Sequence, residues 1–160
     1  MTDSENQTTT EFDLENFLPF RLHKASEAVS RSFRTIYRNE FGMTRSEWRV
    51  LAHLGQFGAM TATEIGTSAS LHKTKVSRAV FSLEQRRWLS RSPDQRDRRV
   101  QILSLTKSGA QAYRQLGKKA KAYNDELTVK LGAKKMARIL ELTDTLQQVV
   151  SKSANNTKSK

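Results

Sequence analysis

The sequence predicts a mainly α-helical fold with one small β-hairpin, arranged as a winged helix-turn-helix core flanked by N- and C-terminal helices. Three observations carry this prediction. Apolar residues recur at steps of three and four over long stretches, which is typical of amphipathic helices. The 160 residues include two prolines and seven glycines, so few positions interrupt a helix. Residues 88–105 break the helical pattern with β-prone segments on either side of a turn.

The first helix is expected over residues 15–41. Pro19 fits the first turn of such a helix, and Gly42 is expected to end it. The polar and acidic residues 1–13 before it are expected to form a disordered tail. The apolar face of this helix consists of Leu18, Leu22, Ala25, Val29, Phe33, Ile36 and Tyr37.

Two capping-box patterns predict the next two helices. Thr44 is followed by Glu47, and Thr61 by Glu64, each pair at the spacing that lets the two side chains cap each other's backbone amides. The second helix of this pair is short and is expected to end near Ser68. A further helix is expected from residue 73 to residue 87. Its apolar stripe is Val76, Ala79, Val80 and Leu83.

This last helix follows the short one after a few residues, which is the pattern of a helix-turn-helix. Its remaining side chains are basic or carry hydroxyl groups, and such groups bind base edges and phosphates. We therefore expect it to be the DNA-recognition helix. The candidate contacts are His72, Lys73, Thr74, Lys75, Ser77 and Arg78.

A hairpin follows, with a strand near residues 88–91, a turn at 92–95 and a returning strand at 100–105. Its tip carries Arg96, Arg98 and Arg99, which suit the narrow and strongly negative minor groove of DNA. Residues 72–107 contain ten Lys or Arg against three acidic residues. The hairpin makes the helix-turn-helix a winged one.

Thr106 is the expected N-cap of a long fifth helix, and Gly132 separates it from a sixth. The terminal helices have narrow apolar stripes, which favour a partner helix and hence a homodimer. The expected organisation is a single domain over residues 14–150 followed by a flexible tail, 151–160. Within this domain, 14–41 and 107–150 are dimerisation helices and 44–106 is the winged helix-turn-helix.

The net charge of +12 predicts a polyanionic partner, nucleic acid first and an anionic membrane surface second. The chain has no cysteine, which excludes disulfides, Cys-zinc sites and thiol-based redox sensing. The three histidines lack metal-ligand spacing, and we expect neither a metal nor another cofactor. No apolar run approaches a membrane span of about 20 residues. The N-terminus is acidic, unlike a secretory signal, so a cytoplasmic protein without membrane contact is expected.

Taken in order, the motifs resemble the MarR family of bacterial transcription regulators over about residues 17–150. The most specific part is the wing signature, an Asp-x-Arg followed by Leu-Thr-x-x-Gly. The residues that carry the resemblance are Lys73-Thr74-Lys75-Val76-Ser77-Arg78, Leu83-Glu84, Arg91, Asp97-Arg98-Arg99 and Leu105-Thr106-Lys107-Ser108-Gly109.

The resemblance implies a homodimer that binds a palindromic operator on double-stranded DNA, usually as a repressor, and is released by a small aromatic or acidic effector. It implies that Asp97 braces the wing arginine, and that this arginine is Arg99 and enters the minor groove. Asp94-Gln95-Arg96 is a second Asp-x-Arg, and Arg96 and Arg98 are candidates for phosphate contacts. Thr61 and Arg91 are further candidates for contacts to the DNA backbone.

The resemblance places the effector pocket between the dimerisation helices and the winged core. An arginine there would pair with an acidic ligand, and Trp48 would stack on an aromatic ring. Packing and solvation remain open as alternative roles for each candidate. The candidates are Arg21, His23, Trp48, Arg49 and His53.

Two other classes of function remain as alternatives. A sequence-independent architectural DNA-binding protein shares the charge, and a winged-helix module for protein contacts shares the fold. An enzyme is not expected, because the chain lacks paired-carboxylate, Ser-His-Asp and phosphate-loop patterns and has no candidate catalytic residue. Glu47, Glu64 and Glu84 are attributed to helix caps or solvated helix faces.

Overall fold

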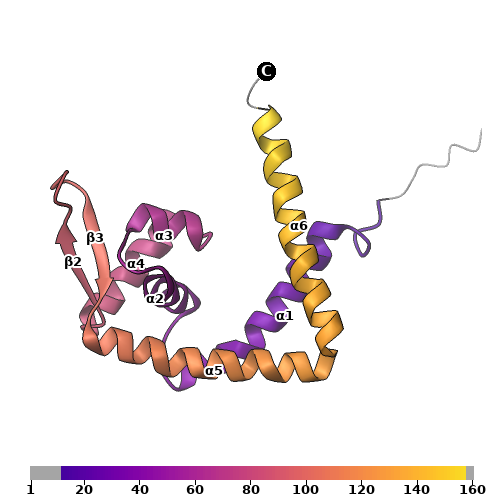
Figure 1. Ribbon diagram of the computed structural model, residues 1–160, viewed down its shortest axis with the longest axis horizontal. Helices are drawn as coiled ribbons and strands as arrows, with labels where there is room; N and C mark the ends of the chain where they lie inside the picture. Colours follow the sequence, from indigo (N-terminus) through magenta and orange to yellow (C-terminus); the bar gives the residue numbers. More distant parts are fainter. Residues whose placement is uncertain (1–11, 158–160) are drawn as a thin grey trace, which may run out of the picture. The chain divides into compact units, whose positions relative to one another are not determined.

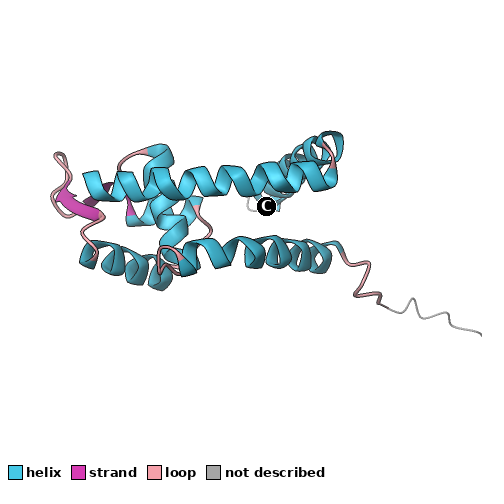
Figure 2. Cartoon of the chain, turned by 90° about the horizontal axis from the view of Figure 1, so that it is seen from below, coloured by secondary structure: helices cyan, strands magenta, loops and turns pink. Residues whose placement is uncertain are grey.

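A computed structural model describes the backbone of residues 12–157 and the side chains up to residue 152. The expected N-terminal tail therefore lies outside the described residues, apart from positions 12 and 13. The chain divides into two units, one ending at Arg45 and the other beginning at Ser46. Figure 2 shows that helices make up most of both units and that the strands belong to one small sheet.

The first unit contains α1 (Leu18–Asn39), which begins three residues later than expected. Pro19 lies in its first turn, and Asp13 instead holds a turn before the helix by accepting hydrogen bonds from the backbone amides of residues 15 and 16. Gly42, with a φ of +59°, follows the helix in the left-handed conformation, as predicted for its end. Phe33 and Tyr37 are buried and contact each other edge to face, with 5.7 Å between ring centroids.

The second unit has a three-helix core: α2 (Arg45–Phe57), α3 (Ala62–Ser68) and α4 (Lys73–Gln85). A three-stranded antiparallel sheet, in the order β1-β3-β2, completes it. Its strands are β1 (Met60–Thr61), β2 (Leu89–Pro93) and β3 (Gln101–Leu105). Figure 1 shows the hairpin of β2 and β3. This hairpin was predicted. Strand β1 was not, because two residues are too short to show an alternating pattern.

The core of this unit is formed by apolar side chains from every helix of the helix-turn-helix, from β3 and from the next helix. Burying each of the larger ones contributes about 1.5–3 kcal/mol to folding. Leu103 of β3 pairs with Met60 of β1 and with Arg91 of β2, so the sheet is anchored at its central strand. The side chains that are at most 1% exposed are Val50, Leu51, Ile65, Val76, Leu83, Leu103 and Leu116.

Two long helices follow, α5 (Lys107–Leu131) and α6 (Ala133–Thr157), separated by Gly132 with a φ of +88°. Figure 1 shows α6 extending from the far end of α5, away from the sheet. The helix continues to Thr157, so the expectation of a flexible tail from residue 151 is wrong for residues 151–157. Neither glycine nor proline occurs there to end the helix. No described helix is long and apolar enough to cross a membrane.

Candidate nucleic-acid interface

Helix α4 is packed through one face and exposed through the other, as its spacing predicted. Val76, Ala79, Val80 and Leu83 are at most 3% exposed. The imidazole of His72, the N-cap, lies 3.5 Å from the backbone amide of Thr74. Every predicted contact residue of the recognition helix lies on the solvent side. These exposed residues are His72, Lys73, Thr74, Lys75, Ser77 and Arg78.

Thr61 has a structural role at the start of α3. Its hydroxyl oxygen accepts a hydrogen bond from the Glu64 amide at 3.2 Å, and the Glu64 carboxylate accepts one from the Thr61 amide at 2.7 Å. The Thr61 amide and the Thr61 hydroxyl both donate to the Glu64 carboxylate, and these two bonds hold its pKa below the usual value. The predicted capping box is therefore confirmed. The prediction of a phosphate contact from Thr61 is weakened, because the hydroxyl also donates to Glu64 at 2.9 Å.

The tip of the wing is held by two aspartates that cap backbone amides. The carboxylate of Asp94 accepts hydrogen bonds from the amides of Asp97, at 3.0 Å, and Arg96, at 2.7 Å, which lower its pKa. The carboxylate of Asp97 accepts one from the Arg99 amide at 3.0 Å. Asp97 thus braces Arg99 through the backbone. Sequence reasoning did not assign Asp94 this role, although its place after Pro93 is typical of a turn.

The tight turn leaves its basic side chains free of the protein core. Arg96, Arg98 and Arg99 are all exposed. Below them, the strands remain paired as far as Pro93 and Gln101. The turn is closed by the Asp94 amide, which donates to the Val100 carbonyl at 2.9 Å. The result is a hydrogen-bonded loop that presents three guanidinium groups at one end of the sheet.

Arg91 joins the wing to the recognition helix. From β2 it donates two hydrogen bonds to the carboxylate of Glu84 in α4, from Nε at 2.9 Å and from Nη2 at 2.8 Å. This pairing lowers the pKa of Glu84 and raises that of Arg91. Glu84 is thus not simply a solvated position, and the guanidinium predicted to contact DNA is occupied in bracing the wing. A bidentate pair of this kind also fixes orientation.

The base of the wing is fastened to the end of α4 by the Leu-Thr-x-x-Gly motif. The hydroxyls of Thr106 and Ser108 both donate to the Arg87 carbonyl, at 2.7 and 2.9 Å. Thr106 also caps α5, as predicted, by accepting from the Gly109 amide at 3.1 Å. A Cβ at Gly109 would overlap the Trp88 carbonyl oxygen, so the close contact requires glycine. The motif therefore positions the wing and α5 against α4.

A groove of about 330 Å³ lies between the recognition helix and the wing. Its walls bring together Lys73 and Ser77 of α4 with Arg91 and Gln101 of the sheet. Of the predicted contacts, Lys73, Ser77 and Arg91 therefore lie around one groove, whereas the tip arginines do not line it. Phe81, which the sequence reasoning left out, is also exposed on α4, at 62%. Its place outside the apolar stripe of that helix is the sequence signal for this exposure.

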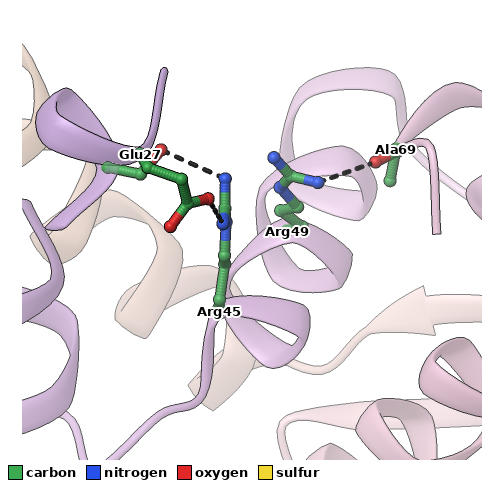
Figure 3. Close-up of polar contacts among 5 residues, drawn as sticks. Glu27, Arg45, Arg49 and Ala69 are labelled. Atoms are coloured by element: carbon green, nitrogen blue, oxygen red, sulfur yellow. Dashed lines mark hydrogen bonds and ion pairs between the residues drawn. The ribbon is translucent and has the colours of Figure 1, made fainter. Parts of the chain in front are cut away.

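The predicted effector-pocket residues do not form one site within either unit. Arg21 and His23 are exposed on α1, and the Arg21 guanidinium lies 3.5 Å from the Asn16 amide oxygen. In the second unit, Arg49 donates to the Ala69 carbonyl at 3.3 Å, as Figure 3 shows. The imidazole of His53 bonds to the Arg49 carbonyl at 2.7 Å, and Trp48 is half-buried.

Two acidic residues pair with arginines outside this interface. Glu27 and Arg45 form a 2.6 Å ion pair within the first unit (Figure 3), which lowers the pKa of Glu27. Glu47 is only 7% exposed, and its carboxylate lies 3.8 Å from the Arg86 guanidinium. The interpretation of Glu47 as a solvated position is therefore wrong, because the first turn of α2 faces the end of α4. Its capping box with Thr44 stays a prediction.

Comparison with known proteins connects this architecture to transcription regulators. Residues 41–100 match the model of the MarR family. YwoH, an uncharacterized HTH-type transcriptional regulator of Bacillus subtilis (strain 168), is 31% identical over 87 residues, which cover 54% of this chain and 63% of that protein. The chain thus spans less than two thirds of this relative. The transcriptional activatory protein BadR of Rhodopseudomonas palustris is 25% identical over 128 residues, 78% of this chain and 73% of BadR.

The fold matches solved structures over nearly their whole length. The MarR family transcriptional regulator SPO1453 from Silicibacter pomeroyi DSS-3 superposes with a TM-score of 0.77 at 28% identity, over 88% of this chain and 99% of that one. Its likeness extends beyond the helix-turn-helix matched by the family model. A winged helix-turn-helix with a hairpin fastened at its base, together with these matches, makes the chain similar in sequence and fold to transcriptional regulators of the MarR family.

Proposed function

We propose that this chain is a DNA-binding transcriptional regulator. In this proposal α4 enters the major groove, and the arginine tip of the wing enters the adjacent minor groove. One observation carries it: the Glu84–Arg91 ion pair holds the exposed basic helix and the exposed arginine tip in one unit. Guanidinium and ammonium groups neutralise phosphates and supply affinity, whereas side chains on α4 supply base recognition.

The regulator acts as a homodimer on a palindromic operator, with α6 at the interface. The support is the exposure of its apolar residues, among them Ile139, Leu140 and Val150, at 45%, 56% and 58%. A two-fold dimer places two recognition helices in major grooves about one helical turn, roughly 34 Å, apart. Two weak half-site contacts then combine into one strong interaction.

The proposed effect on transcription is repression that a small aromatic or acidic effector relieves. Two proteins of this fold support a ligand response. NadR was solved in complex with 4-hydroxyphenylacetate, and 6-hydroxynicotinic acid regulates the DNA binding of Bordetella bronchiseptica BpsR. An effector would act by its difference in affinity for two states of the dimer. Activation, the role named for BadR, is the opposite outcome of a transcription assay.

Selection of bound sequences from a random DNA pool at about 0.15 M salt tests the proposal. The expected product is a palindrome whose half-sites lie about one turn apart. The matched control is the variant with Arg96, Arg98 and Arg99 changed to alanine, which removes the tip charges but leaves both capping aspartates. Recovery of no motif, with binding that disappears as salt rises, would contradict sequence-specific regulation and favour an architectural DNA-binding protein.

A further inference from the structure

Phe81 is an exception on the recognition helix. The other apolar side chains of α4, Val76, Ala79, Val80 and Leu83, are at most 3% exposed, whereas Phe81 is 62% exposed. A large aromatic ring left in water in the free protein gives up the free energy that burial would contribute. The core of the second unit therefore does not use this ring, which remains available to a partner of α4.

The position of Phe81 along α4 shows which partner it faces. It follows Thr74 by seven residues, Ser77 by four and Arg78 by three, and these spacings place side chains on one face of a helix. Thr74, Ser77 and Arg78 are exposed residues of the proposed DNA contact. Glu84, which holds the wing, is three residues further on. The ring thus belongs to the row of side chains that the proposed function directs into the major groove.

The major groove offers one apolar group, the 5-methyl of thymine, and phenylalanine is among the side chains that contact it. We propose that Phe81 packs against a thymine methyl and makes the recognition helix specific for an A·T pair in each half-site. Seven residues of helix span about 10 Å. At 3.4 Å per base pair along DNA, the thymine lies about three base pairs from the pair contacted by Thr74.

The inference rests on the proposed function, and uracil substitution tests it directly. In the operator recovered by selection, each thymine is replaced in turn by deoxyuracil, which removes the methyl group and keeps every hydrogen-bonding atom of the base. At one position per half-site, the wild-type protein should lose about fourfold in affinity, as expected for one buried methyl group. Phe81→Ala should bind the thymine and uracil operators equally well.

Two further variants make the test specific. Phe81→Leu keeps an apolar side chain and should retain a preference for thymine. Phe57→Ala removes a phenylalanine of similar exposure, 64%, from the end of α2, and should keep the full uracil penalty. Circular dichroism and thermal unfolding establish that each variant is folded.

The outcomes separate the two proposals. If uracil substitution lowers the binding affinity of the wild type and of Phe81→Ala by the same factor, the role of Phe81 is overturned and the proposed regulator is left intact. Failure to recover any operator would remove the proposed function and, with it, this inference. A uracil penalty that disappears in Phe81→Ala and persists in Phe57→Ala would establish the contact.

Discussion

The helix-turn-helix core and helix α6 use apolar residues in opposite ways. In the core, Leu51, Ile65 and Leu83 are completely buried within a single chain. In α6, no side chain described, up to residue 152, is buried, although Met136, Ile139, Leu146 and Val150 recur at helical spacings of three, seven and four. Both segments are regular helices. A helical pattern in the sequence therefore predicts the element, whereas its burial depends on what else the chain supplies.

This difference assigns separate roles to the two regions. The core is complete in itself, and the exposed face of α4 and the tip of the wing are rich in basic residues, as suits a polyanion. Apolar residues of α6 such as Ile139, Leu140 and Val150 stay about half exposed in the single chain, which is the pattern expected of a helix that pairs between copies. Four predictions test the distinction, in order of decreasing effect.

The largest effect is expected from a charge in the apolar row of α6. Leu140→Glu should prevent dimerisation, because an unpaired carboxylate would have to be buried between helices. Loss of the second half-site contact should lower operator affinity by about a hundredfold or more. Analytical ultracentrifugation and fluorescence anisotropy measure the two quantities. As a control, Gln148→Glu adds the same charge to an exposed polar position of α6 and should leave the dimer and the operator affinity unchanged. If Leu140→Glu is still a dimer, the proposed role of α6 is contradicted.

A methyl group added at the base of the wing should destabilise the core. In Gly109→Ala the new Cβ meets the backbone of Trp88, so the chain must move, at a cost of about 1–3 kcal/mol in the free energy of unfolding. Urea denaturation measures this loss. Gly117→Ala, in the same helix, has no atom within 4 Å of the added Cβ and should be neutral or stabilising by up to about 1 kcal/mol. Equal stability of the two variants would contradict the close packing at Gly109.

Removal of one wing arginine should weaken binding without affecting the fold. Arg99→Ala should lower operator affinity about tenfold. The slope of log affinity against log salt concentration should become shallower by about one. Its amide, which bonds to Asp97, is kept, so the loop should stay in place. Anisotropy titrations at several salt concentrations measure both effects, with Lys121→Ala in α5 as a control that removes a distant positive charge. Unchanged affinity for Arg99→Ala would exclude a contact from this side chain.

The smallest effect concerns pH. The pKa of Glu84 is lowered by its hydrogen bonds to Arg91, so the folded protein holds the carboxylate in its charged form more strongly than the unfolded chain does. The stabilisation is therefore present at neutral pH and is lost as pH falls through the lowered pKa. A partly exposed pair of this kind contributes about 1 kcal/mol or less.

Glu84→Gln should remove that pH-dependent part of the unfolding free energy, measured by urea denaturation between neutral and acid pH. Glu141 pairs with Arg138 on the exposed face of α6, and Glu141→Gln is the control variant whose unfolding free energy is measured over the same pH range. A wild-type pH profile that matches the profile of Glu84→Gln would contradict a clamp between the wing and α4.

Features that depend on neighbours in the chain were predictable from the sequence. The capping box of Thr61 and Glu64, the N-cap at Thr106 and the apolar stripe of α4 were found because their signals lie within a few residues. Strand β1 forms only by pairing with β3, some forty residues away in sequence. The bracing of Arg91 by Glu84 and the burial of Glu47 are likewise set by tertiary contacts, which a residue pattern does not contain.

The candidate interface follows the same division. The basic residues of α4 and the tip arginines could be named from charge and spacing, and the structure leaves them exposed. The role of Asp94 depends on the turn geometry at the tip. The residue type of Phe81 alone would assign it to the core, whereas its place outside the apolar stripe of α4 indicates the exposure that the structure shows. The effector-pocket residues lie in both units and stay a prediction.

The closed base of the wing has a consequence for a chain that has been cut. Trp88 and Thr106 are joined by a 3.0 Å backbone hydrogen bond, and the strands above them pair as far as Pro93 and Gln101. Consider a single cut in the exposed tip, between Asp94 and Arg99. The two fragments would stay associated through the sheet and the shared core, so a nicked protein would run as intact in gel filtration and separate only on denaturation.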